Sequence, residues 1–91
     1  MKAAVIERQG GIENIVYRDW PDPEPGPGEV RMRNLAIGVN FADTYHRAGV
    51  PHPLVVGDPP VVVGFEAVGT VLEVGDGVSD LAVGEIGRAH V

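Results

Sequence analysis

The chain has 91 residues, 13 of them acidic and 7 basic, which gives a formal net charge of −6. This length fits one small domain or a part of a larger protein, and the scattered basic residues argue against nucleic acid or a membrane surface as a partner. No apolar run approaches the roughly 18 residues needed to span a bilayer, and the charged N-terminus is unlike a signal peptide, so the cytoplasm is the expected location. The absence of cysteine excludes disulfides, thiolate catalysis and cysteine-ligated zinc.

Valine-rich runs bounded by glycine and proline predict a mainly β domain. The first strand is expected at residues 2–7, followed by a turn at residues 9–11 and a strand at residues 14–20 that pairs back on the first. Four prolines in "PDPEPGPG", residues 21–28, remove backbone donors from any regular ladder. That segment is therefore expected to be a rigid connector.

The second half contains longer apolar stretches. Residues 29–39 predict a strand that is exposed at its beginning and buried at Leu35 to Ile37, where both faces become apolar. A proline-rich loop follows at residues 51–60, and residues 61–75 are expected to form a strand pair or one bent strand, with Gly64 and Gly69 as bulge or close-approach points. A hairpin-type turn at residues 75–77 leads toward a further strand after residue 85.

Between these stretches, residues 39–49 lose the period of two and predict a short helix. Asn40 is a preferred N-cap, Asp43 lies three residues on, and Gly49 can end the helix in the left-handed conformation. Two pairs of residues spaced four apart share a face, namely Phe41 with Tyr45 and Asp43 with Arg47. Capping, ion pairing and packing of Tyr45 would explain this segment without any catalytic role.

Two segments together carry a family resemblance: "PGPGEVRMRNLAIGVNFADTYHRAG", residues 25–49, and "GFEAVGTVLEVGDGVSDLAVGE", residues 64–85. They resemble the N-terminal GroES-like domain of medium-chain dehydrogenases/reductases, and are most similar to the quinone oxidoreductase or zeta-crystallin branch. The implied fold is a GroES-like, partly open β-barrel with one or two short helices over residues 1–85, truncated before the Rossmann domain. The Rossmann domain of this family would hold most of the cofactor. The glycine-rich GxGxxG motif of that domain does not occur in this sequence.

The resemblance also implies the chemistry. Zinc-dependent members carry cysteine at the position of Asn40 and histidine at that of Phe65, so no metal ligands are expected and the parent enzyme should work without zinc. The branch transfers hydride from NADPH to a small quinone, enone or other electron-poor alkene, with the cofactor supplying the hydride. The parent protein is expected to be a homodimer, and the fragment alone to be inactive.

Asn40 and Tyr45 match positions that line the cleft beside the nicotinamide, so both are candidate catalytic and cofactor-binding residues. The amide can hold a carbonyl or carboxamide, and the phenol can donate a hydrogen bond or proton to developing negative charge. Asp43 is a further candidate for cofactor binding. Glu66 is expected to pair with an arginine, and His46 and His52 to be surface or loop residues.

Two alternatives stay open. One is an enoyl-thioester reductase of the same superfamily, which would also place a tyrosine near the nicotinamide. The other is a non-enzymatic GroES-like binding module, for which the loop at residues 51–60 is a poor match. Separately, "IGRAHV" at residues 86–91 equals one translated frame of a widely used sequencing-library adapter, so this tail is hypothesised to be non-native.

Overall fold

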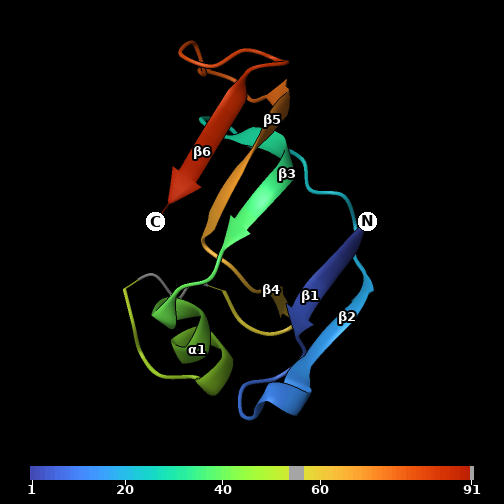
Figure 1. The fold of residues 1–91 in the computed structure, drawn as a ribbon, viewed down its shortest axis with the longest axis vertical. Coiled ribbons are helices and arrows are strands. Elements are labelled where there is room, and N and C mark those ends of the chain that lie inside the picture. The colour runs from blue at the N-terminus through green and yellow to red at the C-terminus, as the bar shows by residue number, and fades with distance from the viewer. Residues whose placement is uncertain (54–56, 91) are drawn as a thin grey trace. The chain divides into compact units, whose positions relative to one another are not determined.

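The computed structural model describes residues 1–53 and 57–90. The chain divides into two compact units. Unit 1 comprises residues 1–21 and 39–65, and unit 2 comprises residues 22–38 and 66–90. Each unit contains one three-stranded sheet, with the order β2-β1-β4 in unit 1 and β3-β5-β6 in unit 2 (Figure 1).

The sheet of unit 1 is built around strand β1, Lys2–Ile6. It pairs antiparallel with β2, Ile15–Asp19, and with the short strand β4, Val61–Val62. Val5 and Ile6 on this central strand are fully buried and form the centre of this unit's core. The predicted pairing of the first two strands is confirmed, although a 3₁₀ helix at Ile12–Asn14 completes the connection between them.

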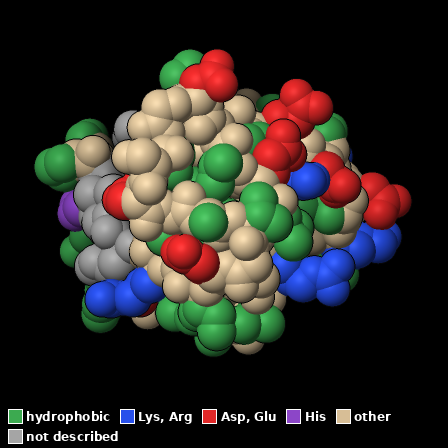
Figure 2. All heavy atoms as spheres, turned by 90° about the horizontal axis from the view of Figure 1, so that it is seen from above, with side chains coloured by type: hydrophobic (Ala, Val, Ile, Leu, Met, Phe, Trp, Pro, Cys, Tyr) green, Lys and Arg blue, Asp and Glu red, His purple; other side chains and the backbone are tan. Residues whose placement is uncertain are grey.

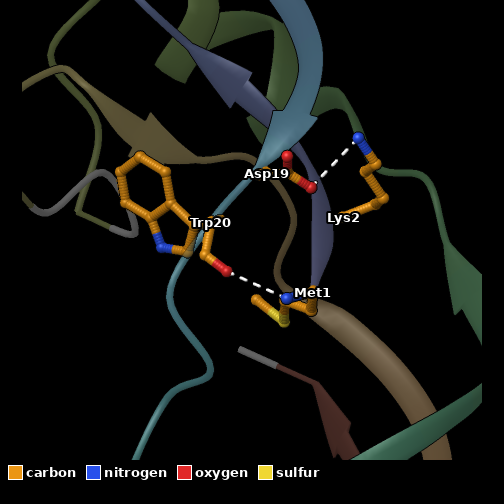
Figure 3. A network of polar contacts seen from close by, with 4 residues as sticks. All are labelled: Met1, Lys2, Asp19 and Trp20. Atoms are coloured by element: carbon orange, nitrogen blue, oxygen red, sulfur yellow. Dashed lines mark hydrogen bonds and ion pairs between the residues drawn. The ribbon is translucent and has the colours of Figure 1, made fainter.

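Backbone hydrogen bonds close the open end of the β1–β2 pair (Figure 3). The Trp20 N–H donates to the Met1 carbonyl at 2.9 Å, and the Met1 amino group donates to the Trp20 carbonyl at 3.1 Å. Beside them, Lys2 Nζ lies 3.0 Å from Asp19 Oδ1 in an exposed ion pair. Exposed pairs of this kind contribute about 1 kcal/mol at most, so backbone pairing is the main stabilising term at this end.

Helix α1, Phe41–Ala48, forms where the sequence predicts it. Its buried residues are Ala42 and His46, whereas Phe41 is 80 % exposed. The packing of Tyr45 that would have explained this segment without a catalytic role is therefore not seen, because the buried face is the neighbouring one, with Ala42 and His46. A spacing of four shows that two residues share a face, but not which face meets the sheet.

The helix is tied to the turn after β1 at its C-terminal end. Arg47 Nη1 donates to the Gly10 carbonyl at 2.6 Å, and the Gly10 N–H donates to the Arg47 carbonyl at 2.8 Å. The expected ion pair between Asp43 and Arg47 is therefore wrong. The hydrogen bond from Arg47 to the Gly10 carbonyl is partly buried. Such a bond stabilises the fold more than an exposed Asp43–Arg47 ion pair, which would contribute a few tenths of a kcal/mol.

The sheet of unit 2 is built around β5, Glu66–Val74, which pairs antiparallel with β3, Val30–Gly38, and with β6, Ile86–His90. Val71 on the central strand is almost fully buried. As predicted, no strand forms in the proline-rich connector before β3. The final strand, β6, includes most of the tail that the sequence marks as suspect.

One burial prediction in unit 2 was wrong. Leu35 and Ile37 are exposed, whereas the beginning of β3 is half-buried. β3 is an edge strand, and in the described part of unit 2 no helix covers its apolar end. Apolar composition indicates that a surface favours burial, but it does not supply the element that buries it.

Residues 61–75 form two strands, as one of the two predicted alternatives required, but β4 and β5 belong to different sheets. Gly64 lies between them, outside either strand, with φ 124°. An added Cβ there would meet nothing within 4 Å, so the bulge or close approach predicted at Gly64 is wrong, and its backbone conformation accounts for the glycine. At Gly69 the β3 backbone approaches so closely that an added Cβ would overlap the Arg33 carbonyl, which confirms the predicted close approach. The turn at residues 75–77 contains Gly77 with φ 82°, but it begins a longer connection to β6 and not a two-residue hairpin.

The mainly β fold class is confirmed, with one α-helix and one 3₁₀ helix among the described residues. Each sheet has two edge strands, so neither closes into a barrel. On the face drawn in Figure 2, acidic side chains stand at several separate points and the basic ones gather only in small groups. In the part of the chain that the structure describes, no helix is both long and apolar enough to cross a membrane.

Candidate functional site

Asn40 occupies the N-cap of α1, as the sequence predicts. It forms a capping box with Asp43, in which the Asn40 N–H donates to Asp43 Oδ2 at 3.0 Å. At the other end, Gly49 adopts the left-handed conformation with φ 82°, and its N–H donates to the Tyr45 carbonyl at 2.9 Å. At both ends, these bonds satisfy backbone groups that a helix otherwise leaves unpaired. Both ends of the helix are therefore well defined.

The capping box uses only part of the Asp43 carboxylate. Asp43 Oδ1 is shielded from solvent and has no hydrogen-bond partner among the described residues. An unpaired buried acceptor usually costs free energy, which makes such an atom worth explaining. The structure therefore shows a capping role for Asp43, and its second oxygen is not open to a ligand from solvent.

Tyr45 lies on the outer face of the helix with 37 % of its surface exposed. Its ring centroid is 6.5 Å from that of Phe41 and 5.3 Å from that of His52. No described residue forms a hydrogen bond with its hydroxyl. The phenol is thus an accessible donor whose ring has two aromatic neighbours.

His46 was missed by sequence reasoning, which expected a surface residue. Its side chain is only 2 % exposed, and neither ring nitrogen has a partner among the described residues. Its ring lies 5.7 Å from that of Phe65. The available signal was the spacing of four from Ala42, which places both residues on one face, but histidine has no strong preference for burial that would select it.

Glu66, in unit 2, pairs with an arginine as expected. Arg88 Nη2 lies 3.8 Å from Glu66 Oε2 across β5 and β6. Because Arg88 belongs to the suspect tail, the pair joins a native strand to residues whose origin is in question. Glu66 also lies against Gly38, where an added Cβ would overlap its carboxylate.

The structure thus brings Asn40, Asp43 and Tyr45 together on one short helix and its cap. Phe65 belongs to the same unit and contacts the buried side of that helix through His46. Among residues 1–53 and 57–90, no group of three His, Asp or Glu side chains is arranged to hold a metal ion. The polar groups of the site are the Asn40 amide and the Asp43 carboxylate, which cap the helix, and the accessible Tyr45 phenol.

Comparison with known proteins places this geometry in a family. The profile of the alcohol dehydrogenase GroES-like domain matches residues 26–86. The chain is 65 % identical over 83 residues to a 2-haloacrylate reductase of Burkholderia, covering 91 % of this chain and 25 % of that protein. It is 48 % identical over 77 residues to a quinone oxidoreductase of Pseudomonas aeruginosa, covering 84 % of this chain and 22 % of that one.

Solved structures agree with these relatives. The crystal structure of Escherichia coli quinone oxidoreductase complexed with NADPH superposes with a TM-score of 0.81 at 33 % identity, covering 94 % of this chain and 26 % of that one. The chain therefore spans about a quarter of the length of the relatives it matches. It belongs to the alcohol dehydrogenase GroES-like domain family, within the quinone oxidoreductase branch of the medium-chain dehydrogenases/reductases.

Proposed function

We propose that the chain is the N-terminal catalytic domain of an NADPH-dependent, zinc-independent reductase that acts on quinones or electron-poor alkenes. The observation that carries the proposal is the Tyr45 phenol, which is accessible and has no hydrogen-bond partner among the described residues. The Burkholderia relative is a 2-haloacrylate reductase, and 2-haloacrylate is an alkene made electron-poor by its carboxylate and halogen.

Hydride addition to such a substrate places negative charge on an oxygen or on a carbon beside a carbonyl group. A positioned donor that meets this charge accelerates the reaction, typically by about 10²- to 10⁴-fold. Tyr45 would supply that donor through its hydroxyl. Asn40, one turn earlier at the helix N-terminus, would use its amide to orient a substrate carbonyl or a carboxamide.

NADPH is proposed as the cofactor because the E. coli relative binds it. When bound, it supplies the hydride. The residues of this chain fit a supporting role, since the Tyr45 side chain is accessible and its hydroxyl is not used by a described residue. Most of the binding is assigned to a Rossmann domain outside this chain, so the isolated chain is proposed to be inactive and the parent to be a homodimer.

Zinc independence is proposed from the chemistry of the side chains. Asn40 and Phe65 stand where the zinc-dependent branch of the superfamily has ligands. An amide is a poor zinc ligand and a phenyl ring is none at all. Phe65 instead contacts the His46 ring.

A chimaera tests the proposed function. Residues 1–85 would replace the matching quarter of the Burkholderia 2-haloacrylate reductase, and NADPH oxidation would be followed with a quinone, with 2-haloacrylate and with an enoyl thioester. Turnover of the quinone or of 2-haloacrylate is expected. A well-folded chimaera that oxidises NADPH with neither would contradict the proposal, and one that accepts only the enoyl thioester would favour the alternative reductase.

Matched variants then assign the roles. Tyr45→Phe keeps the ring and removes the donor, and should lower kcat/KM by at least about 10², whereas Tyr17→Phe at the other, exposed tyrosine should have no effect. Asn40→Ser removes the amide but keeps a good N-cap. It should therefore lower activity without lowering the melting temperature.

The domain is proposed to end near residue 85, with residues 86–91 derived from an adapter sequence. Resequencing the source locus tests this directly. Genomic DNA that encodes the same six residues followed by a stop codon would overturn it.

A further inference from the structure

We propose that His52 is a positioning residue that holds the Tyr45 phenol in one direction. The proposal rests on the role given to Tyr45 above. His52 lies outside the capped helix, in the proline-rich loop, and sequence reasoning assigned it no function. Its imidazole nevertheless lies 5.3 Å from the Tyr45 ring, with an angle of 31° between the planes.

The chain between the two rings is built to bring them together. The Tyr45 carbonyl accepts the N–H groups of both Gly49 and Val50, at 2.9 and 3.0 Å. With Gly49 in the left-handed conformation, these bonds reverse the chain at the end of the helix. His52, two residues after Val50, can therefore return toward the Tyr45 side chain, whose own backbone carbonyl accepts those bonds.

Two prolines then restrict the backbone of His52. Pro51 has a fixed φ, and Pro53 disfavours the helical region for the residue before it. His52 consequently has few backbone conformations to lose when its ring settles beside Tyr45. A ring held in this way restrains its neighbour better than one on a freely moving loop.

Tyr45 has a second ring neighbour on its own helix. Phe41 lies one helical turn earlier, with its ring centroid 6.5 Å away and its plane tilted by 42°. The Tyr45 ring therefore has one ring neighbour from the helix and one from the loop. Aromatic neighbours at these distances are mutually favourable, so removal of His52 leaves the phenol with Phe41 as its ring neighbour.

Ring contact, and not proton transfer by the imidazole, is the proposed mode of action. His52→Phe should therefore retain the function, because it keeps a flat ring, and His52→Ala should lose it. In the chimaera, His52→Ala is expected to lower kcat/KM by about 2- to 13-fold, the range set by the free energy of an aromatic pair. His52→Phe should stay within about twofold of the unaltered chimaera.

A double-mutant cycle separates positioning from a general effect on folding. In the Tyr45→Phe background there is no hydroxyl to aim, so adding His52→Ala should leave kcat/KM unchanged. An equal loss in both backgrounds would overturn the proposal. So would a His52→Phe variant as impaired as His52→Ala, because that result would assign the role to the imidazole nitrogens.

The contact itself is tested without any activity measurement. The chain of 91 residues contains two tyrosines, so isotope labelling of tyrosine gives two sets of ring resonances. His52→Ala should shift those of Tyr45 and leave those of Tyr17 in place, and His52→Phe should preserve a ring-current shift on Tyr45. Unchanged Tyr45 resonances in His52→Ala would refute the contact, whereas an inactive chimaera that still shows the shift would count against the proposed function alone.

Discussion

Gly69 provides a sharp test of the packing in unit 2. It lies on the central strand β5, paired with Asn34 of β3 on one side and with Gly87 of β6 on the other. A Cβ added at Gly69 would overlap the Arg33 carbonyl oxygen and lie 2.9 Å from its carbonyl carbon. Both atoms belong to backbone, so no side-chain rotation can relieve the overlap, and β3 would have to move away from β5.

The displacement of β3 sets the loss of stability expected for Gly69→Ala. Overpacking costs about 1–3 kcal/mol, and the loss of one neighbouring ladder hydrogen bond adds about 1 kcal/mol. Gly69→Ala should therefore lower the free energy of unfolding by about 2–4 kcal/mol. A 91-residue chain is expected to have about 5–14 kcal/mol in total, and so few of its described hydrophobic residues are buried that the lower end applies.

Gly87→Ala is the matched control. It changes the cross-strand partner of Gly69, but its Cβ would lie 3.4 Å from Met32 Sδ and 3.7 Å from Val71 Cγ2, both of which are ordinary van der Waals contacts. Urea unfolding followed by circular dichroism should give a midpoint lower by more than about 1 M for Gly69→Ala, and a small change for Gly87→Ala. Equal midpoints for Gly69→Ala and the unaltered chain would refute the account of strand β5.

Three further predictions concern stability and are measured in the same way. Asp43→Ala removes the acceptor for the Asn40 N–H and should lower the free energy of unfolding by about 1 kcal/mol. Thr44→Ala, at an exposed position on the same helix, should lower it by less. Equal losses for the two variants would contradict the capping role. His46→Leu should leave the free energy of unfolding unchanged or raise it by up to about 1 kcal/mol, because it removes two unpartnered buried nitrogens. His46→Ala should lower it by about 2–3 kcal/mol. A strongly destabilised His46→Leu variant would show that the imidazole has a partner. Deletion of residues 86–91 removes the partner strand of residues 66–70, and Gly87 beside the buried Val71. It should lower the free energy of unfolding by more than about 2 kcal/mol, whereas Arg88→Ala should lower it by less than about 1 kcal/mol. An unchanged free energy after the deletion would show that β6 contributes nothing.

Much of the local structure could be predicted from the sequence. Alternating and β-branched runs gave the strands, and the prolines of residues 21–28 excluded a strand there. Asn40, Asp43 and Gly49 defined α1 to within a residue at each end, because capping depends on side chains and glycine within one turn of the helix. Such features depend on neighbours in sequence, so they can be read without the fold.

Predictions that depended on distant residues were less successful. Leu35 and Ile37 are exposed despite their apolar character, and His46 is buried despite its polarity. Arg47 bonds to Gly10, 37 residues away, and not to Asp43 on its own helix. In each case the outcome was decided by whether another segment lies against the side chain.

The candidate site shows the same division. The sequence by itself determined the family, the capped helix and the candidate pair of Asn40 and Tyr45, because these depend on residue types at short, fixed spacings. Only the tertiary structure decided that Tyr45 faces outward with an unused hydroxyl and that His52 lies against its ring. The physical reason is that a side chain's environment is set by the packing of segments far apart in the chain, and local periodicity carries no information about that packing.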